Sequence, residues 1–161
     1  AEKDDTIYDR DTGYWLDFAK KSNWKTTVAF NGGHKQSEKM LNENSNNADL
    51  RGPFTQASWE NILGEINFKI DSGHYKEGDQ IMILVNSHGV LKDSNEVSHS
   101  VYVGQKGKGS VSLDQLKEIV QKTKEKKIKL ALVDGSCFSG NIQNLKNGSA
   151  CIISATGKDH V

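Results

Sequence analysis

One stretch of the sequence decides the expected fold: Lys129-Leu-Ala-Leu-Val-Asp-Gly-Ser-Cys137-Phe-Ser-Gly140. The apolar run 130–133 does not alternate with polar residues, which is typical of a strand buried on both faces inside a parallel sheet. The run ends in a turn of small residues, and Cys137 lies on that turn. Because ligand sites in parallel sheets lie just beyond the carboxyl ends of the strands, the stretch predicts a thiol at a functional edge.

A second stretch follows the same plan, Gln80-Ile-Met-Ile-Leu-Val-Asn-Ser-His88-Gly89. It is also an apolar run, and it ends in a histidine followed by a glycine. Two adjacent parallel strands of this kind would bring an imidazole beside the thiol of Cys137. Gly89 has no side chain, so we expect its backbone N–H, together with that of Cys137, to form an oxyanion hole.

Helical patterns alternate with these strands along the chain. This alternation predicts an α/β fold, with a mostly parallel central sheet and helices on both faces. After an N-terminal arm, we expect a packing helix near 14–19, a strand at 26–31 and a helix from Thr55 to 66. An exposed hairpin arm at 97–103 should follow the His-bearing strand, and Ser112 and Gln115 should cap the next helix. We expect a short helix at 141–145 and a strand at 150–155 after the Cys-bearing strand.

Three further residues have side chains that could bear chemistry. His34 follows the glycine break that ends the first expected strand, and it is a candidate for substrate contact. His99 lies on the expected hairpin arm and is interpreted as solvated or cross-strand. Cys151 lies in the apolar run 150–153 and is predicted to be a buried core thiol. The His and Cys spacings do not match a metal site, so we expect no metal or cofactor.

Composition limits the classes of protein that remain. A length of 161 residues predicts a single domain over 1–161 with a substantial core. The 21 basic and 21 acidic residues cancel, which argues against nucleic-acid binding. The sequence lacks an apolar run of the ~20 residues that a membrane span needs. The chain begins at Ala1, and processing there would favour a secreted or periplasmic protein.

The two strand ends together resemble the caspase-like clan of cysteine peptidases, which includes caspases, metacaspases, legumain and clostripain. In these proteins a His-Gly ends one strand, and a Cys ends the next, in bacterial and metacaspase-like members commonly within Asp-x-Cys-x-Ser-Gly. Here the matching residues are Ser87-His88-Gly89 and Asp134-Gly-Ser-Cys137-Phe-Ser-Gly140. Cys137 follows His88 by about 50 residues, as in caspases. The resemblance covers about residues 26–161 and implies a caspase-like α/β/α sandwich.

The resemblance implies a cysteine endopeptidase with a Cys–His dyad and a peptide or protein substrate. Cys137 would be the nucleophile, His88 would protonate the leaving amine, and the N–H groups of Gly89 and Cys137 would hold the oxyanion. Metacaspase-like relatives carry an acidic residue two positions before the Cys that helps to select basic substrates. Here Gly135 takes that position, which leaves the residue preference open. Further candidates for the substrate pocket are Asp134, Ser136, Ser154, Ala155 and Thr156.

The resemblance also implies maturation by self-cleavage of a zymogen. The chain stops at Val161, just past a strand that leads, in the family, into further pocket residues and another strand. We therefore expect the C-terminal part of the fold to be missing from this chain or to be a second chain. That second chain would be the protein's own C-terminal fragment, acting as its partner.

Two alternatives stay open from the sequence. The turn Gly135-Ser-Cys137-Phe-Ser139 partly resembles the nucleophile turn of other cysteine hydrolases, amidases and glutaminases among them, with His160 as the base. In the second alternative, the chain is a catalytically silent binding domain with the caspase fold.

Overall fold

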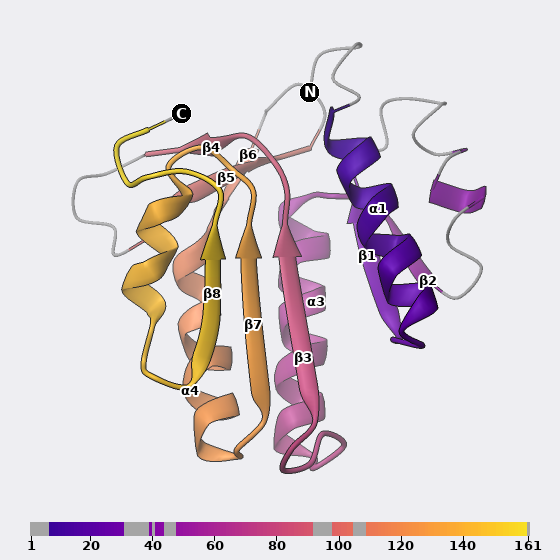
Figure 1. Ribbon diagram of the computed structural model, residues 1–161, viewed down its shortest axis with the longest axis vertical. Coiled ribbons are helices and arrows are strands. Elements are labelled where there is room, and N and C mark those ends of the chain that lie inside the picture. The colour runs from indigo at the N-terminus through magenta and orange to yellow at the C-terminus, as the bar shows by residue number, and fades with distance from the viewer. Residues whose placement is uncertain are drawn as a thin grey trace. The chain divides into compact units, whose positions relative to one another are not determined.

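The computed structural model describes residues 7–30, 39, 41–43, 48–91, 98–104 and 109–160. It confirms the expected mixed α/β class with mostly parallel strand pairing (Figure 1). The helical segments are Ile7–Lys21 (α1), Gln56–Asp71 (α3), Leu113–Leu116 (η2, a 3-10 helix), Lys117–Glu125 (α4) and Ser139–Leu145 (η3, a 3-10 helix). The strands are Thr26–Phe30 (β1), Ala48–Pro53 (β2), Gln80–Val85 (β3), Gly89–Val90 (β4), Ser100–Val103 (β5), Gly109–Ser112 (β6), Lys129–Asp134 (β7) and Ala150–Ser154 (β8).

The chain divides into two compact units. The first comprises Ala1–Trp59 with Val103–Gly109, and the second comprises Glu60–Tyr102 with Ser110–Val161. The first unit holds α1 and the parallel pair β1–β2. Strand β2 is not among the strands expected from the sequence. Gly52 and Pro53 are unfavourable inside a strand, but both strands of a two-stranded sheet are edge strands, where proline is tolerated.

Helix α3 begins where the sequence predicts it. The side-chain oxygen of Thr55 accepts a hydrogen bond from the backbone N–H of Ser58 at 3.2 Å, and the Ser58 hydroxyl accepts one from the backbone N–H of Thr55 at 2.8 Å. This reciprocal pair satisfies two donors that the first turn of a helix would otherwise leave free. The prediction that Thr55 caps this helix is confirmed.

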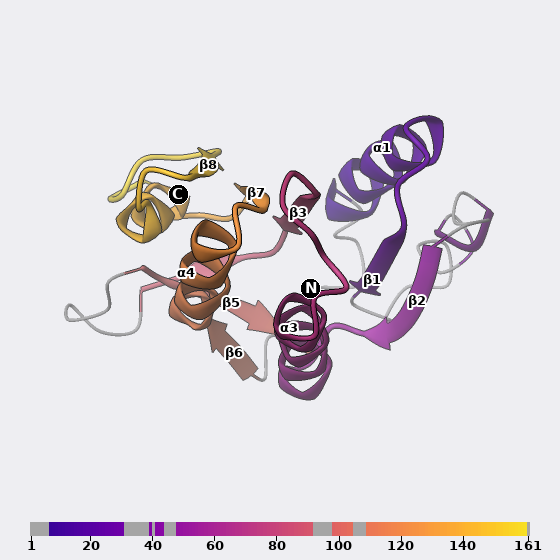
Figure 2. The same cartoon turned by 90° about the horizontal axis from the view of Figure 1, so that it is seen from below.

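The second unit is built on a parallel sheet with the order β3-β7-β8. Neighbouring strands pair without a bulge, so alternate residues form rows across the sheet. One set of rows, which includes Ile83 and Leu132, is buried. Figures 1 and 2 show α4, η3 and the second-unit part of α3 against the same face of the sheet. Burial of each large aliphatic side chain there stabilises the fold by about 1.5–3 kcal/mol.

The opposite face of this sheet corrects two predictions. The row Met82, Ala131 and Cys151 is half-buried in β3 and β7 and exposed in β8. The run 130–133 is therefore not buried on both faces, and Cys151 is not a core thiol. The reason is that β8 is an edge strand and that the helices of the second unit lie on the other face, so the apolar run alone does not report burial.

Helix α4 and the η2 turn before it supply the helical side of this core. Leu113, Leu116, Ile119 and Val120 are buried, as their spacing predicts. The hydroxyl of Ser112 accepts a hydrogen bond from the backbone N–H of Asp114 at 3.2 Å, because the first turn is a 3-10 turn. Ser112 is thus confirmed as the N-cap.

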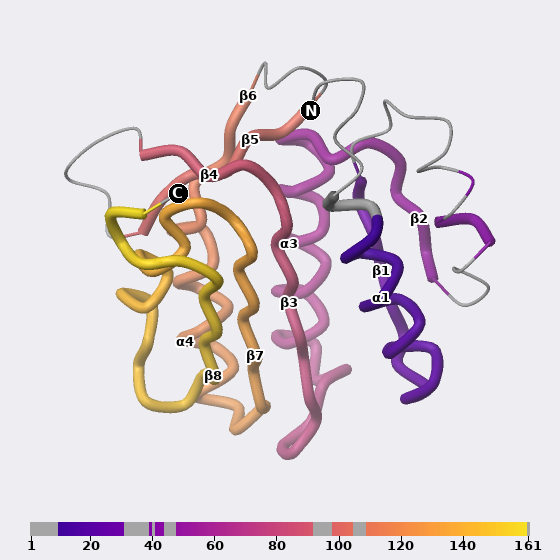
Figure 3. Tube along the Cα trace, turned by 45° about the horizontal axis from the view of Figure 1, so that its top comes forward, coloured from indigo at the N-terminus to yellow at the C-terminus, as the bar shows by residue number. Residues whose placement is uncertain are grey.

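A small sheet with the order β4-β5-β6 stands at the carboxyl end of the main sheet. Figure 3 shows the chain passing from β3 over that end into β4. The antiparallel pairing of Gly89 with Val101 and of Val90 with Ser100 confirms a hairpin-like arm after the His-bearing strand. The arm is not exposed as expected, because Ser100, Val101 and His99 are buried.

Candidate active site

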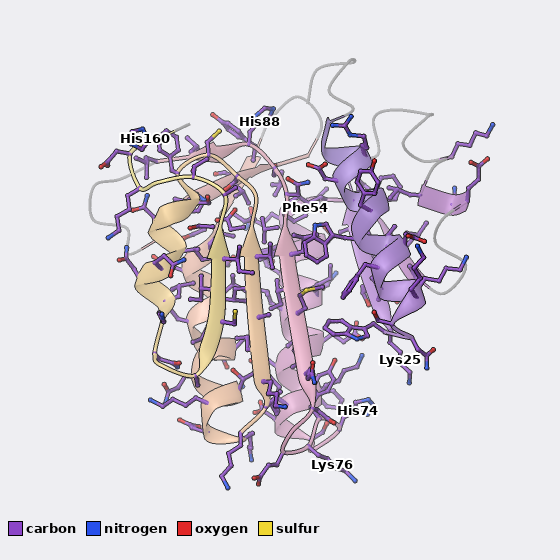
Figure 4. The ribbon with its side chains drawn as sticks, in the orientation of Figure 1. Lys25, Phe54, His74, Lys76, His88 and His160 are labelled. Atoms are coloured by element: carbon purple, nitrogen blue, oxygen red, sulfur yellow. The ribbon has the colours of Figure 1, made fainter. Side chains whose placement is uncertain are left out.

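The strand register places His88 and Cys137 at matching positions. Strands β3 and β7 pair in parallel up to Val85 and Asp134, and each of the two residues lies three positions beyond this last pair. Figure 4 shows His88 at the carboxyl end of the strands, whereas His74 lies at the opposite end. The side chain of His88 is exposed, and Cys137 is half-buried.

The backbone of Gly89 packs directly against the backbone of Cys137. A Cβ atom built on Gly89 would lie 2.7 Å from the carbonyl carbon of Cys137 and 3.0 Å from its nitrogen. Carbon contacts are normally about 3.5–4.0 Å, so only glycine fits at this position. The structure therefore brings together the two residues whose N–H groups the sequence assigns to the oxyanion hole.

The His88 segment is held by β5. The backbone N–H of Tyr102 donates to the carbonyl oxygen of His88 at 2.9 Å. The hydroxyl of Ser87 donates to the carbonyl oxygen of Tyr102 at 2.8 Å. These bonds extend the β4–β5 ladder back to the histidine and fix the main chain from which its side chain projects.

The turn that carries Cys137 is strained and braced. Phe138 has a φ of 60°, the left-handed conformation, which costs roughly 1–2 kcal/mol for a residue with a Cβ atom. Its backbone N–H donates to the carbonyl oxygen of His160 at 2.8 Å, and its carbonyl oxygen accepts from the Asn141 side chain at 3.0 Å. Such strain persists only where surrounding contacts over-determine it, and it is commonest at functional sites.

The segment after β8 supports the same turn. The backbone N–H of Thr156 donates to the hydroxyl of Ser139 at 2.8 Å, and the backbone N–H of Ser139 donates to the hydroxyl of Thr156 at 3.1 Å. The N–H of Ala155 donates to the carbonyl oxygen of Asp134 at 3.0 Å. Of the predicted pocket residues, Ala155 is exposed, and Ser154 and Thr156 are half-buried beside the turn.

Asp134 and Ser136 lie behind the turn. Their exposed fractions are 0% and 1%, and they meet His99, whose exposed fraction is 0%. The Nε2 atom of His99 lies 2.8 Å from the Ser136 hydroxyl oxygen and 3.1 Å from Asp134 Oδ2. Ser136 donates to Asp134 Oδ1 from its backbone N at 2.9 Å and from its hydroxyl at 2.7 Å. Both side chains therefore face the interior of the unit rather than an open pocket.

His99 lies in a different environment from the one expected from the sequence. Its expected solvated or cross-strand position is wrong, because the side chain is fully buried and bonded to the Cys137 turn. Period-two alternation could have indicated this, since His99 shares one face of the arm with Val101 and Val103, both buried. The predicted substrate contact, His34, lies outside the described residues.

The described part of the chain holds no group of three or more His, Cys, Asp or Glu side chains that would suit a metal ion. Among its helices, none is long and apolar enough to cross a bilayer. The chain matches no protein-family model, no curated protein and no solved structure.

Proposed function

We propose that the chain is a cysteine endopeptidase with a caspase-like α/β/α fold, in which Cys137 is the nucleophile and His88 the proton carrier. The observation that carries the proposal is the contact between the Gly89 and Cys137 backbones at matching ends of β3 and β7. This contact supports a site in which a histidine, a thiol and two backbone donors share one edge of a parallel sheet. The motif resemblance points to the same residues.

In the proposed reaction, the sulfur of Cys137 bonds to the carbonyl carbon of the substrate, and the thiol proton passes to His88. The carbonyl electrons move to the oxygen, which the N–H groups of Gly89 and Cys137 hold; one such donor is typically worth about 3 kcal/mol. The carbon–nitrogen bond then breaks, and His88 gives the proton to the leaving amine. Water hydrolyses the thioester and restores the thiol.

We propose that the substrate side chain just before the scissile bond binds next to the Cys137 turn. Ala155 and Thr156 follow β8 at the carboxyl end of the sheet, and their backbones are tied to Asp134 and Ser139. Residues held in this way keep a fixed position relative to the thiol. We therefore place the substrate pocket along the segment after β8.

A second cysteine hydrolase mechanism is favoured by one observation. The carbonyl oxygen of His160 accepts a hydrogen bond from Phe138, the residue after Cys137. Figure 4 shows His160 and His88 at the same end of the strands. In this alternative, His160 would be the base of an amidase-like reaction, and His88 would have no chemical role.

A peptide-library cleavage profile separates these functions. We expect wild type to cleave a defined set of peptides, Cys137→Ala to cleave none, and His88→Ala to lose about 100-fold or more in kcat. His160→Ala and Cys151→Ser are the matched controls, one removing the rival histidine and the other the second thiol, and both should keep the wild-type profile.

Loss of cleavage in His160→Ala alone would establish the amidase-like mechanism instead. Absence of cleavage in wild type, together with no labelling of Cys137 by thiol-reactive peptidyl probes, would indicate a silent binding domain.

A further inference from the structure

The buried network of His99, Ser136 and Asp134 has no part in the proposed chemistry, and its bonds have a direction. An ionised carboxylate only accepts hydrogen bonds, and a serine hydroxyl has a single proton to donate. When the Ser136 hydroxyl donates to Asp134 at 2.7 Å, its oxygen is left to accept from His99 Nε2, 2.8 Å away. The network therefore runs from His99 through Ser136 to Asp134, with His99 as the first donor.

This network is not a second nucleophilic triad. In a Ser-His-Asp triad, the serine and the carboxylate bind opposite nitrogens of the imidazole. Here both face Nε2, and Nδ1 of His99 is buried without a hydrogen-bond partner among the described residues. Ser136 is also 1% exposed, so its hydroxyl is closed to a substrate.

We propose that His99 is a positioning residue that holds the Cys137 turn in register with the His88 segment, an inference that rests on the proposed peptidase function. His99 lies immediately before β5, the strand whose Tyr102 N–H binds the His88 carbonyl. Its side chain binds Ser136, the residue before Cys137. One buried imidazole thus ties the strand that holds the proton carrier to the turn that holds the nucleophile.

The network also explains why a carboxylate is tolerated in the core. Asp134 is the last residue of β7, and its side chain lies on the same buried face of the strand as Leu130 and Leu132. A buried carboxylate is costly unless it is bonded. Oδ1 accepts two hydrogen bonds from Ser136, whereas Oδ2 accepts none from the described residues and lies 3.1 Å from His99 Nε2. The carboxylate therefore anchors the first residues of the turn from the interior.

The test compares His99→Leu, which removes the donor, with His99→Gln, which keeps an amide N–H near the place of Nε2. A misplacement of about 1 Å at reacting groups costs on the order of 100-fold in rate. We expect His99→Leu to lower kcat by about 10–100-fold with KM nearly unchanged, and His99→Gln to recover most of the loss. Thr123→Val removes another buried hydroxyl, one bonded within α4, and should leave kcat unchanged.

Ser136→Ala covers the case in which His99→Leu fails to fold, because it deletes only the hydroxyl that links the network. A folded His99→Leu or Ser136→Ala protein with wild-type kcat would overturn the proposal. Equal losses in His99→Gln and His99→Leu would also overturn it, since a merely structural role for the ring would not be rescued by the amide.

Amide hydrogen exchange separates this proposal from the peptidase function. In His99→Leu, loss of the buried bond should speed exchange across residues 134–140 by about five- to tenfold, with α4 unchanged. If wild type cleaves no peptide but this local increase appears, the peptidase proposal fails while the tie between the two segments stands. Unchanged exchange across 134–140 would reject the tie whatever the activity.

Discussion

Substitution of Gly89 by alanine gives the sharpest test of the site. The new Cβ atom would lie 2.7 Å from the carbonyl carbon of Cys137. The carbonyl oxygen of Cys137 lies closer still, and an ordinary carbon contact is at least about 3.5 Å, so the two backbones must separate by at least about 1 Å. Since a shift of that size at reacting groups costs about 100-fold, we expect kcat to fall by about that factor, equivalent to about 2.7 kcal/mol of barrier.

The same substitution should also destabilise the fold, because overpacking of a close contact costs about 1–3 kcal/mol. Gly64→Ala is the matched control: Gly64 lies within helix α3, and a Cβ atom there would meet nothing within 4 Å. Alanine at that position should stabilise the protein by about 0.5–1 kcal/mol and leave kcat unchanged.

Steady-state kinetics on the best library peptide and thermal unfolding measure both effects. Wild-type stability and wild-type kcat in Gly89→Ala would show that the backbone contact has no consequence for the fold or the reaction. The stability comparison between the two alanine variants is independent of the reaction. It therefore tests the geometry even if the chain proves to have a different activity.

Lys127 has a φ of 54°, so Lys127→Gly should be about 1 kcal/mol more stable than Lys127→Ala in denaturant unfolding; equal stabilities would contradict the strain. Thr156→Val removes the hydroxyl that accepts a hydrogen bond from the Ser139 backbone N–H and should cost about 1–2 kcal/mol by the same assay; unchanged stability would show that this bond is dispensable. The hydrogen bond that Lys122 donates to Asp71 raises the pKa of Lys122 above its ordinary value of 10.5. The stability difference between wild type and Lys122→Met should therefore be complete below pH 10.5 and shrink as the pH rises through the raised pKa, whereas a constant difference would indicate packing.

The identity of most elements could be predicted from local patterns. The apolar runs that end at Val133 and Val85 became most of β7 and β3, and the spacing of Leu116 and Ile119 marked the buried face of the helical segment that contains α4. These patterns succeed because strand and helix periodicity are properties of neighbouring residues. The candidate pair His88 and Cys137 followed in the same way, since each stands where a strand stops.

Other features depended on contacts that no local pattern encodes. Cys151 belongs to a run as apolar as that of β7, yet it is exposed because β8 is an edge strand. The alternation of His99 with Val101 and Val103 is compatible with burial, but the partner of its side chain, Ser136, is distant in the sequence. Burial is decided by what covers a face, and a side chain's partner by which strands meet.

Local patterns were enough to predict that two strands lead into His88-Gly89 and Cys137, and that helices alternate with them. The contact between the Gly89 and Cys137 backbones and the network of His99, Ser136 and Asp134 behind them became known from the folded structure. The physical reason is range: periodicity and turn chemistry act over a few residues, whereas register and burial arise when segments far apart in the chain pack together.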